Sequence, residues 1–420
     1  WSGEFISAIG SGLTSFGLGI FVYKLTGNAI SMTLVTLLGF LPSLLLSAPS
    51  GVLADRYDRR LLMILGDSLS AIGIVLILVF ILINQINLAV ICIGVFISSV
   101  FSSLMAPAYK ATVSDLLTKE QYAKASGLVQ IADSSKYLIA PLLAGFLLTI
   151  SDIKLLLIID ISTFFITVST TTYVRKGLVS KKSEVKTRMI KDLVDGWKYL
   201  SSKKGVLILL VVTSIINFFM GFIQTLSIPM VLAITNEAAL GTLETIITCG
   251  MLVSSILIGS LKIKGNYVRM LWIALAANGI AMFLYGSRPN LIFITITGFL
   301  FFATLPFANT SIECLIRSNI DNEMQGRAWG LITIISELGC VFSYAIGGPL
   351  ADFIFTPGLS ENGFLADNVG RFWGTGDGRG CGFLISICGI LIVVMALILS
   401  KQKKVRELED AVVLTSDKKE

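Results

Sequence analysis

The sequence predicts an all-α membrane protein with twelve transmembrane helices in two pseudo-symmetric six-helix halves. Of its 420 residues, 54% are hydrophobic and only 14% are charged. Soluble proteins carry about 25% charged residues, and a soluble fold of this length could not bury so much apolar surface. The apolar runs, such as 61–83, are also longer than the alternating segments of about ten residues that build a transmembrane β-barrel. Together these observations predict helices that cross a lipid bilayer.

The expected spans are apolar runs of about 20 residues, the length that a helix needs to cross a bilayer. They cover 3–23, 31–53, 61–83, 88–107, 125–149, 154–174, 206–233, 239–261, 268–286, 290–313, 328–353 and 381–400. Pro107 and Pro306 stand in the fourth and tenth runs, so we expect those two spans to be interrupted.

A polar, basic segment at 176–205 separates the first six spans from the last six. We therefore expect an N-terminal half at 1–175, this segment as a cytoplasmic linker, a C-terminal half at 206–400 and a cytoplasmic tail at 401–420. Within the linker, apolar residues recur at helical spacing, which predicts an amphipathic helix over 185–201 on the inner membrane surface. These residues are Ile190, Leu193, Val194 and Trp197.

The distribution of basic residues predicts the orientation of the chain. Most of the 33 Lys and Arg residues lie on one side of the expected spans, namely in the linker, the tail and the loops that share their side. The other side holds Lys24, Lys154, Arg288, Arg371 and Arg379. Because cytoplasmic loops carry the excess of Lys and Arg, both termini are expected in the cytoplasm of a bacterial cell, with the spans in the plasma membrane. The net charge of +6 reflects this topology and does not indicate a nucleic-acid partner.

The two halves share a weak internal repeat. Residues 124–127 (Lys-Ala-Ser-Gly) correspond to 327–330 (Arg-Ala-Trp-Gly), and 51–53 correspond at nearly the same offset to 259–261. Such a repeat indicates duplication of a six-span unit, and in two-half transporters the substrate site lies between the halves near the bilayer midplane.

The segment after the second span carries a recognisable motif, Gly51-Val-Leu-Ala-Asp-Arg-Tyr-Asp-Arg-Arg60. It resembles the signature loop between the second and third helices of the major facilitator superfamily, Gly-x-Leu-Ala-Asp-Arg-x-Gly-Arg/Lys-Arg/Lys. Asp58 departs from the pattern, where the family usually has Gly. With this Asp, 39–42 (Gly-Phe-Leu-Pro) and 326–327 (Gly-Arg), the chain is most similar to the branch that includes macrolide efflux proteins and the enterobactin exporter.

The resemblance, which covers essentially the whole chain, implies a gating role for this loop. Asp55 would pair with a nearby Arg or with the end of a helix in the other half, holding the cytoplasmic side closed until the halves rock. The alternative is that these charges only obey the positive-inside rule. The implied gating residues are Gly51, Leu53, Asp55, Arg56, Arg59 and Arg60, and Gly51 would allow a close helix approach.

Two features of proton-coupled members of the family are altered here. Where many members carry an Arg in the fourth span, this chain has 96–99 (Phe-Ile-Ser-Ser). The antiporter signature that ends the fifth span as Gly-Pro-x-x-Gly-Gly is reduced to 140–145 (Ala-Pro-Leu-Leu-Ala-Gly). Both departures concern the usual proton relay and leave the expected fold unchanged.

Charged residues inside a span are costly and mark functional sites. Asp133 and Lys136 lie about 12–17 Å into the fifth span, close enough on one helix face to pair, and Glu337 lies at a similar depth in the eleventh. We expect all three on a central cavity, where a carboxylate would bind a proton or a cationic substrate. The alternative for Asp133 and Lys136 is a structural pair that holds the helix in place.

Other polar residues within spans have weaker assignments. The amides Gln130, Asn217, Gln224 and Asn309 either hydrogen-bond a ligand or join neighbouring helices. For Glu4, Asp160 and Glu244 we expect side chains that reach a membrane interface.

Several chemistries lack the residues they need. The six cysteines form no CxxC pair, the chain has no His, and no P-loop sequence occurs. We therefore expect no cofactor, no metal and no enzyme activity, with energy supplied by a gradient. The sequence predicts a secondary transporter that exports hydrophobic or amphiphilic molecules, such as drugs, macrolides or siderophores, by proton antiport. The expected partners are a small lipophilic substrate, protons and the bilayer, and the protein is expected to be a monomer. A proton-coupled nutrient importer and a non-transporting lipid translocase or sensor are the alternatives.

Overall fold

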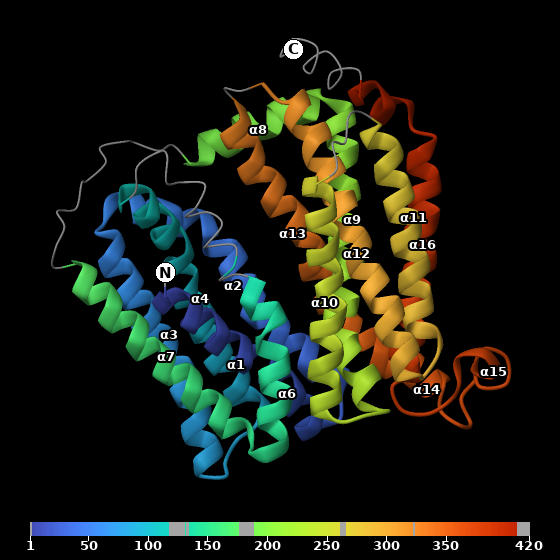
Figure 1. Cartoon of the computed structure of the whole chain (residues 1–420), viewed down its shortest axis with the longest axis horizontal. Helices are drawn as coiled ribbons and strands as arrows, with labels where there is room; N and C mark the ends of the chain where they lie inside the picture. Colours follow the sequence, from blue (N-terminus) through green and yellow to red (C-terminus); the bar gives the residue numbers. More distant parts are fainter. Residues whose placement is uncertain are drawn as a thin grey trace. The chain divides into compact units, whose positions relative to one another are not determined.

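A computed structural model of the chain describes residues 2–116, 131, 134–175, 189–260, 266–321 and 324–409. These residues form helices and their connections, without a strand in the described ranges (Figure 1). Eleven of the described helices are long and apolar enough to cross a membrane. Of the expected span at 125–149, the structure describes residue 131, residues 134–138 and the short apolar helix α6 (Ala140–Ile150). The prediction of an all-α membrane fold is confirmed.

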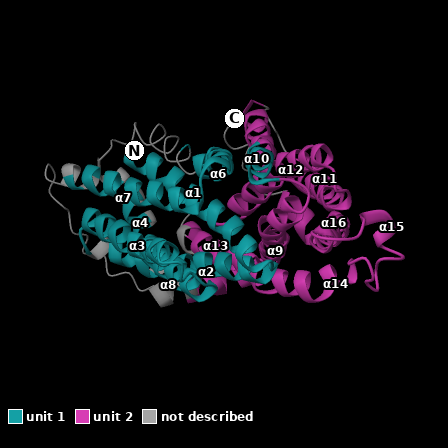
Figure 2. Cartoon of the chain, turned by 90° about the horizontal axis from the view of Figure 1, so that it is seen from below, with its two compact units in different colours: residues 1–187, 236–245 teal, residues 188–235, 246–420 magenta. Residues whose placement is uncertain are grey.

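The chain divides by its internal contacts into two compact units, shown in teal and magenta in Figure 2. Unit 1 contains residues 1–187 and 236–245. Besides α6, its described helices are α1 (Ser2–Thr26), α2 (Ala29–Arg56), α3 (Arg59–Leu82), α4 (Leu88–Leu116) and α7 (Ile153–Arg175), with the first turns of α10 (Glu237–Ser260).

Unit 2 contains residues 188–235 and 246–420. Its long helices in the described ranges, besides the rest of α10, are α8 (Met189–Ser202), α9 (Lys204–Leu232), α11 (Tyr267–Ser287), α12 (Leu291–Asn319), α13 (Gln325–Leu350) and α16 (Arg379–Ser400). A π-helical turn, η3 (Ala351–Phe355), and the short helices α14 (Thr356–Gly358) and α15 (Gly370–Trp373) connect α13 to α16. The domain boundaries expected from the sequence stay a prediction.

The expected interruptions at Pro107 and Pro306 are absent. Helix α4 continues past Pro107 to Leu116, and α12 continues past Pro306 to Asn319. Proline removes one backbone donor, but in a membrane helix the neighbouring helices and Ser or Thr side chains satisfy the freed carbonyl groups. The prediction was wrong because it applied the rule for soluble helices.

Neighbouring helices approach closely where both carry glycine. In unit 2, a Cβ atom added to Gly286 of α11 would lie 2.0 Å from the carbonyl oxygen of Gly382 in α16. In unit 1, a Cβ atom added to Gly73 of α3 would lie 2.1 Å from the carbonyl oxygen of Gly94 in α4. Small residues at such contacts let two backbones pack against each other, which is how helices associate when lipid removes the hydrophobic drive between them.

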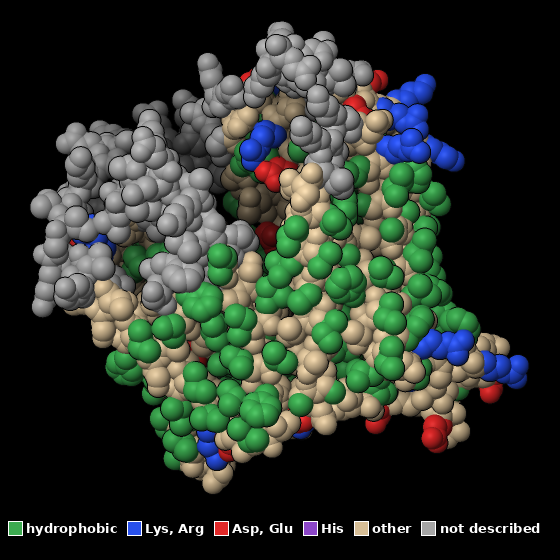
Figure 3. Space-filling view, viewed as in Figure 1, with side chains coloured by type: hydrophobic (Ala, Val, Ile, Leu, Met, Phe, Trp, Pro, Cys, Tyr) green, Lys and Arg blue, Asp and Glu red, His purple; other side chains and the backbone are tan. Residues whose placement is uncertain are grey.

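The outward faces of the long helices are apolar. Figure 3 shows hydrophobic side chains over the flank formed by α10, α11 and α16, whereas Lys and Arg gather near helix ends. Exposed side chains of these three helices include Ile256 (69% exposed), Ile280 and Ile398. Exposed apolar surface of this extent is stable against lipid and not against water.

From the sequence, Arg379 was expected to be a charge in a loop between spans, but its side chain is buried. It is 4% exposed at the start of α16. Its Nε donates to the carbonyl oxygen of Trp373 at 2.6 Å, and its Nη2 donates to the carbonyl oxygens of Gly286 and Ser287 at 3.1 and 3.2 Å. The guanidinium group thus satisfies carbonyl groups at the end of α11, which a helix end otherwise leaves without partners.

The amphipathic helix expected over 185–201 is present as α8, which lies across the ends of α9 and α13 (Figure 1). Its apolar side chains Val194 and Trp197 are 46% and 48% exposed, as expected for a face that meets lipid. Residues 185–188 lie outside the described part of the chain.

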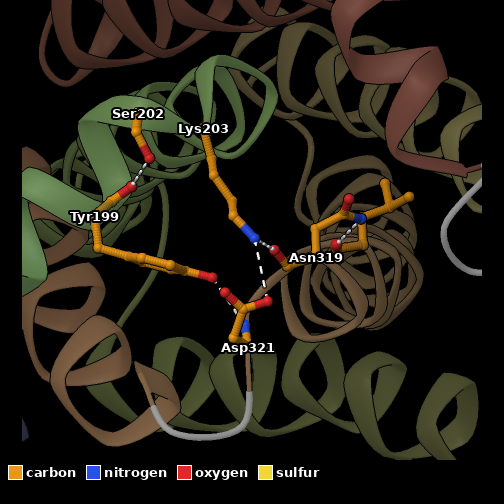
Figure 4. A network of polar contacts seen from close by, with 6 residues as sticks. Tyr199, Ser202, Lys203, Asn319 and Asp321 are labelled. Atoms are coloured by element: carbon orange, nitrogen blue, oxygen red, sulfur yellow. Dashed lines mark hydrogen bonds and ion pairs between the residues drawn. The ribbon is translucent and has the colours of Figure 1, made fainter.

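A polar network fixes the junction of α8 and α9 against the end of α12 (Figure 4). Lys203 Nζ donates to the carbonyl oxygen of Asn319 at 2.7 Å and lies 3.5 Å from Asp321 Oδ1, while the Asp321 N–H donates to the Tyr199 hydroxyl at 2.9 Å. The Tyr199 hydroxyl, with the Lys203 ammonium, holds the pKa of Asp321 below its ordinary value. Burial lowers the pKa of Lys203, but Tyr199 and Asp321 raise it by more than burial lowers it. The pKa of Lys203 therefore lies above its ordinary value. The pair therefore stays ionised at neutral pH.

Replacing Gly286 with Ala should destabilise the protein by about 1–3 kcal/mol, because the added methyl group meets the backbone of α16 and the helices must separate. Thermal unfolding of the purified protein in detergent would measure the loss. Gly259→Ala is the matched control, since its added Cβ meets no described atom within 4 Å. Equal melting temperatures for both variants would contradict the close contact.

Candidate functional site

The motif segment 51–60 forms the end of α2, a two-residue connection and the start of α3. Asp58 is the N-cap of α3, and its carboxylate accepts hydrogen bonds from the N–H groups of Arg60 at 3.0 Å and Leu61 at 3.4 Å. Asp and Gly are both favourable N-cap residues. This explains why Asp58 can stand where the pattern usually has Gly.

Two basic residues of the motif are held by the same turn. Arg59 Nε donates to the carbonyl oxygen of Ala54 at 3.1 Å, and Arg60 is 6% exposed. A Cβ atom added to Gly51 meets no described atom within 4 Å, so the close helix approach expected there is not made with the described residues. The side chains of Asp55 and Arg56 lie outside the described part of the structure, and the gating role stays a prediction.

Of the charged pair expected in the fifth span, the structure describes Lys136. Asp133 and Gln130 lie outside the described residues. Lys136 is half-buried and packs against α1, where an added Cβ at Gly12 would lie 3.0 Å from its carbonyl oxygen and 3.1 Å from its Cγ. It also interacts electrostatically with Asp160 of α7. The pairing of Lys136 with Asp133 stays a prediction.

The contact between α9 and α13, here called the α9–α13 seam, carries three of the predicted polar residues: Asn217, Gln224 and Glu337. Asn217 Nδ2 donates to the carbonyl oxygen of Ser336 at 3.0 Å, and Cys340 Sγ donates to the carbonyl oxygen of Asn217 at 3.3 Å. Gly339 permits this contact, since an added Cβ would lie 2.0 Å from the carbonyl oxygen of Ser214. Asn217 therefore joins two helices and stands next to Glu337 of α13.

The rest of the α9–α13 seam offers groups that a ligand could reach. The Tyr344 hydroxyl donates to Gln224 Oε1, and the Gln224 side chain is exposed. Glu337 is half-buried, and no hydrogen bond or ion pair joins it to another described residue. Asn309, the fourth predicted amide, is exposed on α12 and has no described bond to the α9–α13 seam.

An aromatic group adjoins these polar residues on α9. The ring of Phe218 meets those of Phe219 and Phe222 edge to face, with centroids 5.3 and 5.1 Å apart. Phe219 and Phe222 are buried, whereas Phe218 is half-buried. Along this stretch the α9–α13 seam therefore combines apolar rings with a few polar groups and one carboxyl group.

Acidic residues of unit 1 occupy positions that the sequence did not predict. Asp160 was expected to reach a membrane interface, but it is 1% exposed and packs against α1, where Ser11 Oγ donates to Asp160 Oδ1 at 3.4 Å. Glu4 is half-buried and acts electrostatically on Asp67 of α3. Asp67 is 2% exposed and was not singled out from the sequence. Its position in an apolar run, two turns after Arg59, was the signal that could have identified it.

The helical architecture and the motif segment agree with comparisons to known proteins. The family model of the Major Facilitator Superfamily matches residues 1–344. The chain belongs to the major facilitator superfamily. A solved structure of the nucleoside transporter NupG superposes with a TM-score of 0.72 over 96% of this chain and 98% of that one, at 13% identity. That likeness concerns the fold alone.

Curated relatives are similar over most of the chain. Macrolide efflux protein A of Streptococcus pyogenes is 26% identical over 424 aligned residues, which cover 97% of this chain and 96% of that protein. The Staphyloferrin A transporter of Staphylococcus aureus is 23% identical, over 79% of this chain and 84% of that protein. The chain is thus a member of a family of multi-pass membrane transporters.

Replacing Asp58 should test the N-cap of α3. Asp58→Ala is expected to cost about 1 kcal/mol of stability, whereas Asp58→Gly should cost only a few tenths of that, because Gly also tolerates the N-cap position. Thermal unfolding of both variants in detergent gives the comparison. A loss that is the same for Gly and Ala would show that the carboxylate acts through something other than the helix terminus.

Proposed function

We propose that the chain exports hydrophobic or amphiphilic small molecules across the plasma membrane of a bacterial cell by alternating access, in exchange for protons. Similarity over nearly the full length to proteins named for macrolide efflux supports export of a lipophilic molecule. The similarity to a Staphyloferrin A transporter supports a siderophore-like molecule as a second substrate type. Macrolides and siderophores share a large size and mixed polar and apolar surfaces.

The α9–α13 seam is the observation that carries this proposal. Its half-buried ring of Phe218 offers apolar contact, and its exposed Gln224 amide offers one hydrogen-bonding group. Pockets for lipophilic ligands are lined mainly by apolar and aromatic side chains with a small number of polar groups that fix orientation. A sugar or nucleotide would need many more paired polar groups. The α9–α13 seam therefore suits an amphiphilic substrate.

Glu337 is the group we assign to charge recognition on the α9–α13 seam. A carboxyl group in apolar surroundings is costly unless it holds a proton or faces a cation. A cationic, lipophilic substrate would supply that cation, and its release would leave the carboxylate ready for a proton. Asp133, which the internal repeat places beside the equivalent position in the other half, is proposed to act in the same way with Lys136. Gln130 and Asn309 are proposed as further polar contacts.

Alternating access needs a cytoplasmic gate, which we assign to the motif segment. In this proposal Gly51, Leu53, Asp55, Arg56, Arg59 and Arg60 close the cytoplasmic side, and both termini lie in the cytoplasm. The cap at Asp58 and the bond from Arg59 to Ala54 support a rigid turn at this position. The halves 1–175 and 206–400 are proposed to rock about the substrate in a monomer.

Efflux from preloaded cells tests the function. Cells that express the protein should export ethidium and a labelled macrolide, and a protonophore should stop that export. Glu337→Gln should lower the initial rate of ethidium efflux by about tenfold, a change that corresponds to about 1.4 kcal/mol. Glu313→Gln is the matched control, because Glu313 is exposed on α12 and pairs with Arg317 one turn away.

The possible outcomes separate the parts of the proposal. Protonophore-sensitive efflux that is normal in Glu337→Gln would contradict the role of Glu337 and leave export standing. Efflux that continues with a protonophore present would contradict proton antiport. Protonophore-sensitive accumulation of label, in place of efflux, would reverse the direction and indicate a nutrient importer.

A further inference from the structure

Three carboxyl side chains on three helices of unit 1 belong neither to the α9–α13 seam nor to the motif segment. Glu4 comes from α1, Asp67 from α3 and Asp160 from α7. Both Glu4 and Asp160 act electrostatically on the Asp67 carboxyl group. We call these three residues the carboxyl cluster. Glu4 belongs to the first turn of α1 and Asp160 contacts α1 at Gly10 and Ser11, so the cluster extends about 10 Å along that helix.

Asp67 is the most unusual member of the carboxyl cluster. It is 2% exposed, and its Oδ2 atom has no hydrogen-bond partner among the described residues. A buried carboxylate oxygen without a donor is costly, whereas a protonated carboxyl group avoids most of that cost.

The place of Asp160 is built for a carboxyl group. A Cβ atom added to Gly10 of α1 would lie 3.0 Å from Asp160 Oδ1 and 2.5 Å from Thr163 Oγ1, so the absence of a side chain at Gly10 makes room for both groups. Ser11 Oγ donates to Asp160 Oδ1 at 3.4 Å, and the Thr14 hydroxyl also borders the carboxyl group. Hydroxyl groups can donate to an ionised carboxylate or accept from a protonated one, so this surrounding tolerates both states.

Few charged groups of the neighbouring helices lie among the described side chains. Lys136 interacts electrostatically with Asp160. Helix α4, on the other side of α3, has no acidic or basic group among its described side chains, and its titratable groups there are Cys92 and Tyr109. Helix α6 has none.

From this arrangement we propose that the carboxyl cluster of Glu4, Asp67 and Asp160 is a proton-binding site, at which the N-terminal half carries the proton that is exchanged for substrate. The inference rests on the proposed antiport and names the part of the chain that would serve it. Glu4, which is half-buried, is the entry to the site, and Asp67 and Asp160 are its buried members. Protonation neutralises the site, and loss of the proton leaves charge that a change in helix packing must accommodate.

Infrared difference spectroscopy of the protein in lipid membranes tests the site without any substrate. A protonated carboxyl group has a C=O stretching band that disappears on ionisation. Raising the pH from mildly acidic to alkaline should remove such a band in the wild type, and Asp67→Asn and Asp160→Asn should each lose part of it. Asp152→Asn is the matched control, because Asp152 is exposed at the start of α7 and pairs with Lys154. A band that both cluster variants retain in full, or that is absent in the wild type, would overturn the proposal.

A second measurement uses the wild-type protein and so does not depend on the folding of a variant. Dicyclohexylcarbodiimide is an apolar reagent that modifies protonated carboxyl groups. Mass spectrometry should find the modification on the peptide that contains Asp67, with less of it at alkaline pH. Modification of other carboxyl groups alone would contradict the assignment.

A transport measurement separates failure of this site from failure of the proposed function. Asp67→Asn should still bind ethidium, measured by its fluorescence anisotropy, but should lose protonophore-sensitive efflux. Normal efflux in Asp67→Asn would overturn the coupling role. If the wild type does not export ethidium or a macrolide, the proposed function fails for those compounds, and the infrared band still decides whether the carboxyl cluster binds a proton.

Discussion

Asp160 of α7 packs its carboxyl group against α1 at 1% exposure, and the residues around it must accommodate a buried group that can carry charge. A charge in an apolar bundle must be neutralised by a proton or a cation, or must be surrounded by donors. Gly10 leaves space for this group, and Ser11 donates to it. Lys136 provides positive charge from the segment before α6. Helix α7 also carries buried apolar side chains, including Leu156 and Leu157 at 0% exposure.

The same constraint separates the two units by chemistry. Unit 1 buries Asp67 of α3 and Asp160 of α7, and Glu4 of α1 is half-buried. In unit 2, the α9–α13 seam has aromatic rings, amide groups and one half-buried carboxyl group. In our proposal the carboxyl cluster of the first unit holds the exchanged proton, and the α9–α13 seam of the second unit binds the substrate. Glu337 serves both, because it faces the cationic substrate and is ready for a proton after the substrate has left.

The sequence predicted the helices well because their signal is physical and strong. A run such as 61–83 has one stable place, which is a membrane, and the structure has α3 there. The ends of helices were predicted less well. Pro107 does not end α4, and membrane helices tolerate an internal proline where other groups satisfy the freed carbonyl. Asp58 departed from the family pattern, and its role as an N-cap became visible only with the backbone of α3.

The site was harder to predict than the fold. Depth along a helix can be counted from the sequence, and it selected Lys136 and Glu337. It does not show which way a side chain points, so Asp160 was expected at an interface although it faces α1. Asp67 also lies within an expected span, but no other charged residue stands within one helical turn of it in the sequence, so it was not singled out. Its partners come from α1 and α7, which only the tertiary fold brings close.

The most direct test of the whole account is a measurement of proton movement with substrate movement in one experiment. The purified wild-type protein would be reconstituted into vesicles that contain a pH-sensitive dye, with an acidic interior and with ethidium outside. The account predicts that ethidium entry is accompanied by proton exit, so that the interior becomes more alkaline as ethidium accumulates. Ethidium entry with no change of internal pH beyond that of protein-free vesicles would contradict it.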